Sequence, residues 1–253
     1  MSSPARRVWA VVPAAGRGAR FDSAQLAGAP KQYAPLLGAT VIEWSLAALL
    51  LEPRVQGIVI ALSPDDRHWP DVVKSLARSK PSASAKLQTT LGGTSRQDSV
   101  VAGLKALDGQ AAADDWVLVH DAARPCLTSV DLAALIDAVE AGPNASLETT
   151  NGALLACPVV DTVKRERGGI AVDTVDRDGL WRALTPQMFG FARLKQALDD
   201  VIRLGLAVTD EAQAMERLGL PAKLVRGSPF NIKVTRAEDL PMAEAILKST
   251  ETH

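Results

Sequence analysis

Short apolar runs alternate with longer amphipathic segments along the chain. The runs at residues 8–12, 55–62 and 116–120 are almost continuously apolar, which predicts buried strands of a parallel sheet. Between the last two runs, residues 95–107 place Val100, Val101, Leu104 and Leu107 on one helical face. Residues 129–139 predict another helix, with Ser129 as its N-cap. This alternation favours an α/β fold with a mostly parallel central sheet flanked by helices.

The segment 152–178 breaks this rhythm. Residues 153–160 and 170–175 resemble strands, and a polar, turn-forming stretch at 164–169 lies between them. We interpret the segment as a β-hairpin that projects from the domain. Because a protruding hairpin exposes strand edges, we expect a partner subunit to cover it. Helices are then expected around residues 189–204, 210–218 and 237–248, with residues 1–253 forming one domain.

Composition and charge exclude several classes of protein. Hydrophobic residues make up 47% of the 253 residues and the formal net charge is −1, so we expect no general attraction to nucleic acid or anionic membrane. No apolar run approaches the ~20 residues of a membrane span, and the first one is too short for a signal peptide, which favours a cytoplasmic protein. Cys126 and Cys157 lack the spacing of a zinc site or a disulfide framework, so we expect reduced thiols.

A glycine loop with the sequence PAAGRGAR follows the first predicted strand, at residues 13–20. Gly16 and Gly18 allow a tight turn that presents backbone N–H groups to phosphate oxygens, and Arg20 could bind a phosphate bidentately. The loop lacks the third glycine of a dinucleotide site, and the chain has no P-loop motif. Lys31 follows about ten residues later as a second cation. Taken alone, these features also fit an ordinary strand-to-helix turn and a solvated lysine.

These motifs begin a series that resembles the 2-C-methyl-D-erythritol 4-phosphate cytidylyltransferases of the non-mevalonate isoprenoid pathway. The family opens with a pattern similar to PAAGxGxR followed by PKQY, and this chain has PAAGRGAR and then PKQY at 30–33. Further matching blocks follow in order over nearly the whole chain: GGTSRQDSV at 92–100, HDAARP at 120–125, DTVK at 161–164, VDRDGLW at 175–181, LTPQ at 184–187, TDEA at 209–212 and NIKVT at 231–235. The resemblance implies a Rossmann-like nucleotidyltransferase fold whose β-hairpin, at about 152–178, is an arm used for dimerisation.

The resemblance also implies the reaction, in which CMP passes from CTP to 2-C-methyl-D-erythritol 4-phosphate with release of pyrophosphate. Such a transfer needs an in-line nucleophile and cations near the charge that builds at the α-phosphate. The family assigns the latter role to the residues that match Arg20 and Lys31. The residues expected to bind CTP are Pro13, Ala14, Ala15, Gly16, Gly18, Gly92, Gly93, Ser99 and Asp121. The residues expected to bind the acceptor are Asp121, Arg124, Thr162, Arg177 and Lys233, of which Arg177 and Lys233 position its phosphate.

Several assignments remain open on the sequence. Asp121 could bind a ribose hydroxyl, a substrate hydroxyl or Mg²⁺, or could form a structural salt bridge with Arg124. Mg²⁺ is the expected cofactor, held mainly by the CTP phosphates and water rather than by a dedicated protein site. If the family's arm exchange carries over, Arg177 and Thr162 act in the partner's site and the working unit is a homodimer.

Other residues have simpler expected roles, and two rival functions remain. His120 is expected to be structural rather than a base. Asp210 and Glu211 are expected to begin a helix, where acidic side chains complement the helix dipole. One rival is a ribitol 5-phosphate cytidylyltransferase, whose opening tends to be LAGGxGxR and whose later block tends to be DAVRP, where this chain has PAAG and DAARP. The other rival is a non-catalytic CTP-binding protein.

Overall fold

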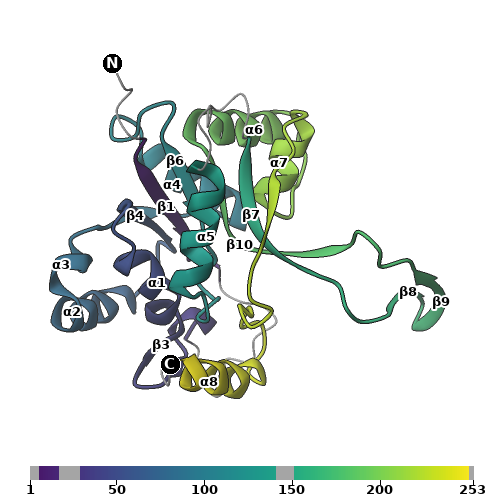
Figure 1. The fold of residues 1–253 in the computed structure, drawn as a ribbon. Helices are drawn as coiled ribbons and strands as arrows, with labels where there is room; N and C mark the ends of the chain where they lie inside the picture. The colour runs from purple at the N-terminus through teal and green to yellow at the C-terminus, as the bar shows by residue number, and fades with distance from the viewer. Residues whose placement is uncertain (1–5, 17–28, 141–150, 251–253) are drawn as a thin grey trace.

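A seven-stranded sheet forms the centre of the computed structural model, which describes residues 6–16, 29–140 and 151–250 (Figure 1). Its strand order is β11-β7-β10-β6-β1-β4-β5. The neighbours β6, β1, β4 and β5 are parallel, as are β11 and β7, whereas β10 runs antiparallel to both β6 and β7. The strand bounds are β1 Val8–Pro13, β4 Val55–Leu62, β5 Leu87–Leu91, β6 Trp116–Val119, β7 Gly152–Pro158, β10 Trp181–Gly190 and β11 Lys223–Arg226. The predicted α/β class, and the three strands predicted from apolar runs, are confirmed.

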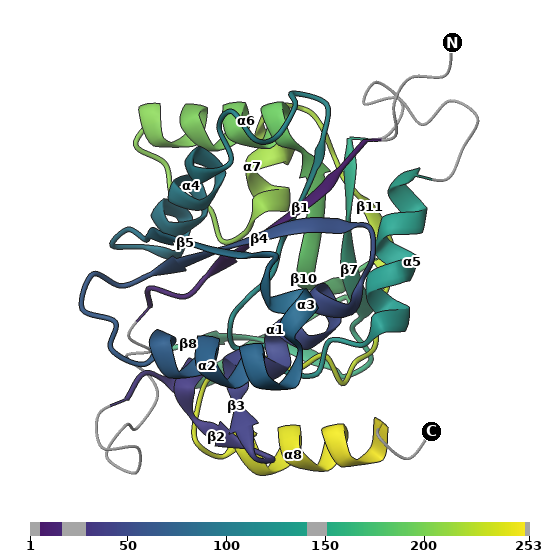
Figure 2. The same cartoon turned by 90° about the vertical axis from the view of Figure 1, so that its left-hand side faces the viewer.

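Helices cover both faces of this sheet because its central strands are apolar on both sides (Figure 2). In β1, Val8, Ala10 and Val12 face the core formed with α1, α2 and α5, whereas Trp9 and Val11 face the core formed with α4, α6 and α7. The first layer comprises α1 Val41–Leu51, α2 Trp69–Ser79 and α5 Ser129–Glu140. The second layer comprises α4 Arg96–Ala106, α6 Phe191–Arg203 and α7 Glu211–Arg217.

Smaller elements complete the body beside the first layer. A single 3₁₀ turn, η2 Lys31–Tyr33, precedes the short strands β2 Pro35–Leu36 and β3 Ala39–Thr40, and α3 Pro81–Ser84 follows α2. The last helix, α8 Asp239–Thr250, packs through Ala243 and Leu247 on a third apolar cluster that includes Val234. The structure thereby brings the C-terminal segment to the region that follows β1 and β6.

Five predicted helices are present, and one predicted cap is wrong. The residues 95–107, 129–139, 189–204, 210–218 and 237–248 correspond to α4, α5, α6, α7 and α8. At α5, the backbone N–H of Asp131 donates to the hydroxyl of Thr128 at 3.1 Å. Because an N-cap side chain accepts a bond from the N–H three residues on, the cap is Thr128 rather than Ser129.

The projecting arm is present, but its strands differ from those predicted. The hairpin pairs β8 Val163–Arg167 with β9 Ile170–Val175, and Gly168 and Gly169 form its turn with φ of 61° and 81°. The prediction that residues 153–160 form one strand of the hairpin is wrong, because Gly152–Pro158 is buried in the central sheet as β7. The polar residues taken as a turn lie mostly in β8, where an exposed strand needs no apolar face. The arm extends well away from the body (Figure 1).

Two further observations bear on the expectations about compartment. No helix in the described ranges combines the length and apolar character needed to cross a membrane. Cys126 and Cys157 are buried and carry free thiols.

Candidate active site

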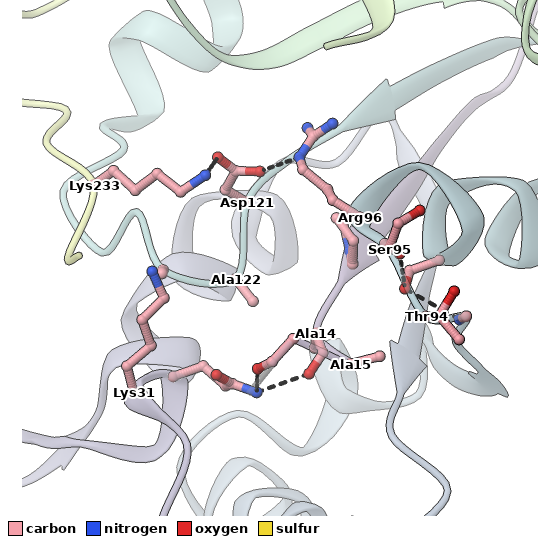
Figure 3. A pocket seen from close by; sticks show the side chains of 15 residues that line it. Ala14, Ala15, Lys31, Thr94, Ser95, Arg96, Asp121, Ala122 and Lys233 are labelled. Atoms are coloured by element: carbon pink, nitrogen blue, oxygen red, sulfur yellow. Dashed lines mark hydrogen bonds and ion pairs between the residues drawn. The ribbon is translucent and has the colours of Figure 1, made fainter. Parts of the chain in front are cut away.

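A pocket of about 320 Å³ lies at the carboxyl ends of β1 and β6 (Figure 3). Ligands of open α/β sheets commonly bind at this edge, because the strands end there in loops that face one another. The pocket is lined by segments that are far apart in the sequence: Pro13, Ala14, Ala15, Gly16, Lys31, Gln32, Gly93, Thr94, Ser95, Arg96, Ser99, Asp121, Ala122, Ala123 and Lys233. Nine of these lining residues were predicted from the sequence to belong to the site.

A buried glutamine holds Ala14 and Gly16, which follow β1 directly. The Nε2 group of Gln32 donates to the carbonyl of Ala14 at 2.7 Å and to that of Gly16 at 3.4 Å. These bonds fix the orientation of two peptide groups at the pocket. Sequence reasoning included the PKQY motif but assigned no role to Gln32. The sequence feature that could have identified Gln32 was its polar side chain within this short motif. The structure buries that side chain.

Lys31 reaches the same pocket from η2. Its Nζ donates to the backbone carbonyl of Val234 at 2.7 Å, which joins the segment after β1 to the segment before α8. The turn itself is held by the Tyr33 hydroxyl, which donates to Asp66 at 2.6 Å. The lysine is thus positioned at the pocket rather than solvated at random on a loop.

A glycine pair and the start of α4 form another wall. The backbone N–H of Gly92 donates to Leu62 at 2.7 Å, and a Cβ at this position would lie 2.6 Å from the Cβ of Ala15 and 2.9 Å from the hydroxyl of Ser99. The N–H of Gly93 donates to that hydroxyl at 3.2 Å, and the hydroxyl donates to the Ser95 carbonyl at 2.9 Å. Ser95, not Ser99, is the N-cap of α4, so Ser99 is the first-turn hydroxyl that ties the glycine pair to the helix. The N-terminus of α4 faces the pocket, as an anion site requires.

Asp121 is the centre of a cluster of charges. Its Oδ1 accepts from Arg96 Nε at 2.8 Å, while its Oδ2 lies 2.8 Å from Lys233 Nζ and 3.5 Å from Arg124 Nε. Burial alone raises the pKa of this carboxyl, but the cations Arg96, Lys233 and Arg124 outweigh burial and hold the pKa far below its usual range. The salt bridge left open between Asp121 and Arg124 is therefore present, as part of a larger group.

Arg96 and Glu211 are the site residues that sequence reasoning missed. The two Nη groups of Arg96 donate to the two carboxylate oxygens of Glu211, at 2.7 and 3.0 Å. The expected helix start is confirmed, since Asp210 caps α7 by accepting from Gln213 N–H at 2.9 Å. Glu211 was expected only to complement the helix dipole. Its side chain is buried and also binds Arg96. The available signal was an arginine in the middle of the GGTSRQDSV block.

His120 has the surroundings of a structural residue. It is fully buried, with Nδ1 3.1 Å from the Thr185 hydroxyl and Nε2 3.3 Å from the Arg124 carbonyl. Burial lowers its pKa from 6.5 to about 4, so the ring is neutral at neutral pH. The same Thr185 hydroxyl accepts from the Asp121 N–H at 3.1 Å, which links the histidine to the end of β6.

The remaining predicted residues lie outside the pocket. Gly92 and Arg124 lie directly behind its wall, where Arg124 Nη1 donates to the Asn231 carbonyl at 2.7 Å. Thr162 and Arg177 lie on the exposed arm, where Arg177 donates to the Val160 carbonyl, and the pocket of the same chain does not include them. The predicted residues Gly18 and Arg20 lie outside the described residues.

Known proteins resemble this chain over nearly its whole length. The family profile described as 2-C-methyl-D-erythritol 4-phosphate cytidylyltransferase matches residues 8–249. A protein of that name from Halorhodospira halophila is 46% identical over 241 residues, which cover 95% of this chain and 94% of the relative. One from Pseudomonas paraeruginosa is 45% identical over 234 residues, covering 92% of each.

The chain belongs to this family.

Solved structures agree with the family's fold. A crystal structure described as 4-diphosphocytidyl-2C-methyl-D-erythritol synthase superposes with a TM-score of 0.77 at 34% identity, covering 96% of this chain and all of that one. The Francisella tularensis cytidylyltransferase gives a TM-score of 0.75 at 30% identity, covering 95% of this chain and 99% of that one. The predicted resemblance and the predicted enzyme class, a nucleotidyltransferase, are therefore confirmed.

Proposed function

We propose that this cytidylyltransferase transfers CMP from CTP to 2-C-methyl-D-erythritol 4-phosphate, giving 4-diphosphocytidyl-2-C-methyl-D-erythritol and pyrophosphate. The observation that carries the proposal is the meeting of residues 13–16, Gly93, Lys31 and Lys233 around one pocket. Together with the N-terminus of α4, these residues bring cations and the positive end of a helix to a triphosphate and to a second phosphate beside it. Family membership supplies the identity of the two substrates.

In the proposed reaction, an oxygen of the acceptor phosphate attacks the α-phosphorus of CTP. A bond forms between that oxygen and the phosphorus, and the bond to the bridging oxygen of the β-phosphate breaks, so that pyrophosphate leaves. Lys31, with Arg20 from the predicted loop, stabilises the charge that builds on the phosphates. The backbone around Gly92 and Gly93 would receive the cytosine, where a larger residue would strike Ala15 and Ser99.

The acceptor needs positioning more than it needs a base. A phosphate monoester is already largely dianionic near neutral pH, so its oxygen is nucleophilic once placed in line. Lys233 supplies the positive charge that holds this phosphate, and Arg124 and Asp121 lie beside it. His120 is sealed from the pocket and bonded on both ring nitrogens, so it is not used as a base.

We expect Mg²⁺ to enter the pocket with the nucleotide. Among the described residues, no group of three or more His, Cys, Asp or Glu side chains could hold a metal, and Asp121 is the carboxylate that lines the pocket. Both of its oxygens already contact cations, so CTP phosphates and water would provide most of the ligands. When bound, Mg²⁺ neutralises phosphate charge.

The arm is proposed to act in a second subunit of a homodimer. Thr162 and Arg177 are exposed and do not line the pocket of their own chain. Apolar side chains on and beside the arm are exposed as well, with Val160 at 72% and Ile170 at 67%. An exposed apolar hairpin is normally covered, and a second copy of the chain would both cover it and receive Arg177.

The free thiols fit the reducing cytoplasm, which we propose as the working compartment.

The test is pyrophosphate release from CTP and Mg²⁺ with either of two acceptors. We expect turnover with 2-C-methyl-D-erythritol 4-phosphate and none with D-ribitol 5-phosphate. Turnover with ribitol 5-phosphate alone would keep the chemistry and replace the substrate. Binding of CTP without release in the presence of either acceptor would contradict an enzymatic function.

A further inference from the structure

Glu211 is a buried carboxylate that lies outside the pocket, yet it is connected to it. Its side chain, at the first turn of α7, is 2% exposed, and both oxygens accept from the Nη groups of Arg96. The start of α7 is itself fixed to β10, because Gln187 accepts from the Ala212 N–H at 2.8 Å and donates to Asp210 at 2.9 Å. Glu211 therefore holds Arg96 from a rigid position.

The contact with Glu211 decides how Arg96 meets Asp121. With both Nη groups on Glu211, Arg96 offers only its Nε to Asp121, at 2.8 Å from Oδ1. The second oxygen of Asp121 is left for Lys233 Nζ, also at 2.8 Å, with Arg124 Nε farther away at 3.5 Å. Figure 3 shows Arg96, Asp121 and Lys233 in this order along one wall of the pocket.

Without Glu211, Arg96 could bind Asp121 through two N–H groups instead of one. An arginine fork binds a carboxylate preferentially through two parallel N–H groups, so a freed Arg96 would turn Nε and one Nη onto both oxygens of Asp121. That arrangement would make Arg96 compete with Lys233 for the second oxygen of Asp121. A buried ion pair gives little net stability compared with an apolar pair of similar size. Stability alone therefore does not explain why the pair of Arg96 and Glu211 is present.

We propose that Glu211 is a positioning residue for the transfer reaction, which keeps Arg96 to a single contact with Asp121 and thereby holds Lys233 in place for the acceptor phosphate. The inference rests on the proposed function for its reaction, whereas its geometric part concerns Lys233 alone. Arg96, Asp121 and Lys233 belong to the pocket itself, and Glu211 acts through them.

The kinetic test is Glu211→Gln in the full chain, with Glu216→Gln as the matched control on the exposed side of the same helix. We expect the KM for 2-C-methyl-D-erythritol 4-phosphate to rise by about tenfold or more in Glu211→Gln, while the Kd for CTP stays within about twofold. Glu216→Gln should match the wild type in both. A parallel loss of CTP and acceptor binding in Glu211→Gln would overturn the proposal, because it would indicate a general disturbance of the pocket.

A second measurement does not depend on turnover. Acetylation by acetic anhydride, quantified at single lysines by peptide mass spectrometry, should increase at Lys233 in Glu211→Gln and stay constant at Lys74, an exposed lysine of α2. An inactive wild type would refute the proposed function and still leave this result decisive. If Glu211→Gln does not fold, Glu211→Asp retains the charge at a shorter reach and should show both changes to a smaller extent. Unchanged Lys233 labelling and unchanged acceptor KM in a folded variant with a lowered Tm would show that the pair is only structural.

Discussion

Lys31 illustrates how a single side chain acquires its place from distant parts of the chain. Its own segment is one turn of 3₁₀ helix, in which Gln32 bonds the carbonyl of Ala14 and Tyr33 bonds Asp66. Its ammonium contacts the carbonyl of Val234, close to Lys233 in sequence. These contacts hold the ammonium at the pocket in a defined position, and electrostatic stabilisation of a transition state depends on such preorganised charge.

Replacing this lysine should affect the rate more than substrate binding. In Lys31→Met we expect kcat to fall by about 10²–10³-fold, because a preorganised cation acts most strongly on charge that develops in the transition state. Lys74→Met, on the exposed surface of α2, is the matched control and should retain the wild-type kcat. Steady-state pyrophosphate release measures both. A Lys31→Met enzyme with normal kcat would remove the lysine from the chemistry.

His120 makes stability depend on pH in a defined range. Its folded-state pKa of about 4 lies below the ordinary 6.5, chiefly because burial disfavours the charged ring. The unfolded chain therefore binds a proton first as the pH falls, and the histidine's contribution is fully present above pH 6.5 and is lost towards pH 4. The loss amounts to about 3 kcal/mol over this range.

Urea unfolding at a series of pH values measures that loss. His120→Gln should show a smaller decrease in the free energy of unfolding between neutral pH and pH 4 than the wild type does. His68→Gln, a change at an exposed histidine, should keep the wild-type decrease. Equal decreases in all three proteins would mean that the buried ring is not the group responsible.

Helix α4 packs closely on strand β1 beside the pocket. Gly103 of α4 faces Val11 of β1, and a Cβ on that glycine would lie 2.3 Å from a methyl carbon of the valine. This approach sets the position of the helix whose N-terminus carries Ser95, Arg96 and Ser99 towards the pocket. Glycine is normally unfavourable within a helix, but at position 103 it allows α4 to pack against Val11.

Gly103→Ala should destabilise the protein even though alanine favours helices. The gain in helix propensity is about 1 kcal/mol, whereas overpacking against Val11 costs about 1–3 kcal/mol. We expect a lower free energy of unfolding in urea for Gly103→Ala. The loss should shrink when Val11→Ala is also introduced, since the second change makes room for the added methyl. Stabilisation by Gly103→Ala alone would contradict the close packing.

The elements that were predicted correctly are those whose own hydrophobic pattern indicates burial. Strands β1, β4 and β6 are apolar on both faces, and α4 has a continuous apolar side, so pattern alone located them. Strand β10 was not predicted, because Thr185 and Gln187 are polar and their burial depends on partners elsewhere, among them His120 and Asp210. The hairpin was misplaced because an exposed strand carries no apolar signal.

The candidate site was predictable to a similar extent. Motifs located the glycine loop, Lys31, the glycine pair, Asp121 and Lys233, and the structure brings these together. The pair of Arg96 and Glu211 was missed, because it joins residues 115 positions apart and depends on how α4 and α7 pack on the sheet. Such pairs follow from tertiary geometry, which neither residue's local sequence encodes.

At the scale of the whole molecule, the two parts of the proposed site lie apart within one chain. The pocket lies at the edge of the central sheet, and the arm carrying Thr162 and Arg177 extends away from the body (Figure 1). The central claim is that a pocket from one chain and an arm from a second chain form one transfer site. In a symmetric homodimer such an exchange of arms would be reciprocal, because each chain would give and receive the same contact.

A mixed dimer tests this claim most directly. Lys31→Ala chains with one affinity tag and Arg177→Ala chains with another are co-expressed, and dimers that carry both tags are isolated. Each mixed dimer would contain one site with a normal pocket and a normal arm, so we expect about half of the wild-type pyrophosphate release per dimer, with each parent dimer nearly inactive. Mixed dimers no more active than either parent would contradict the account and assign the arm to the pocket of its own chain.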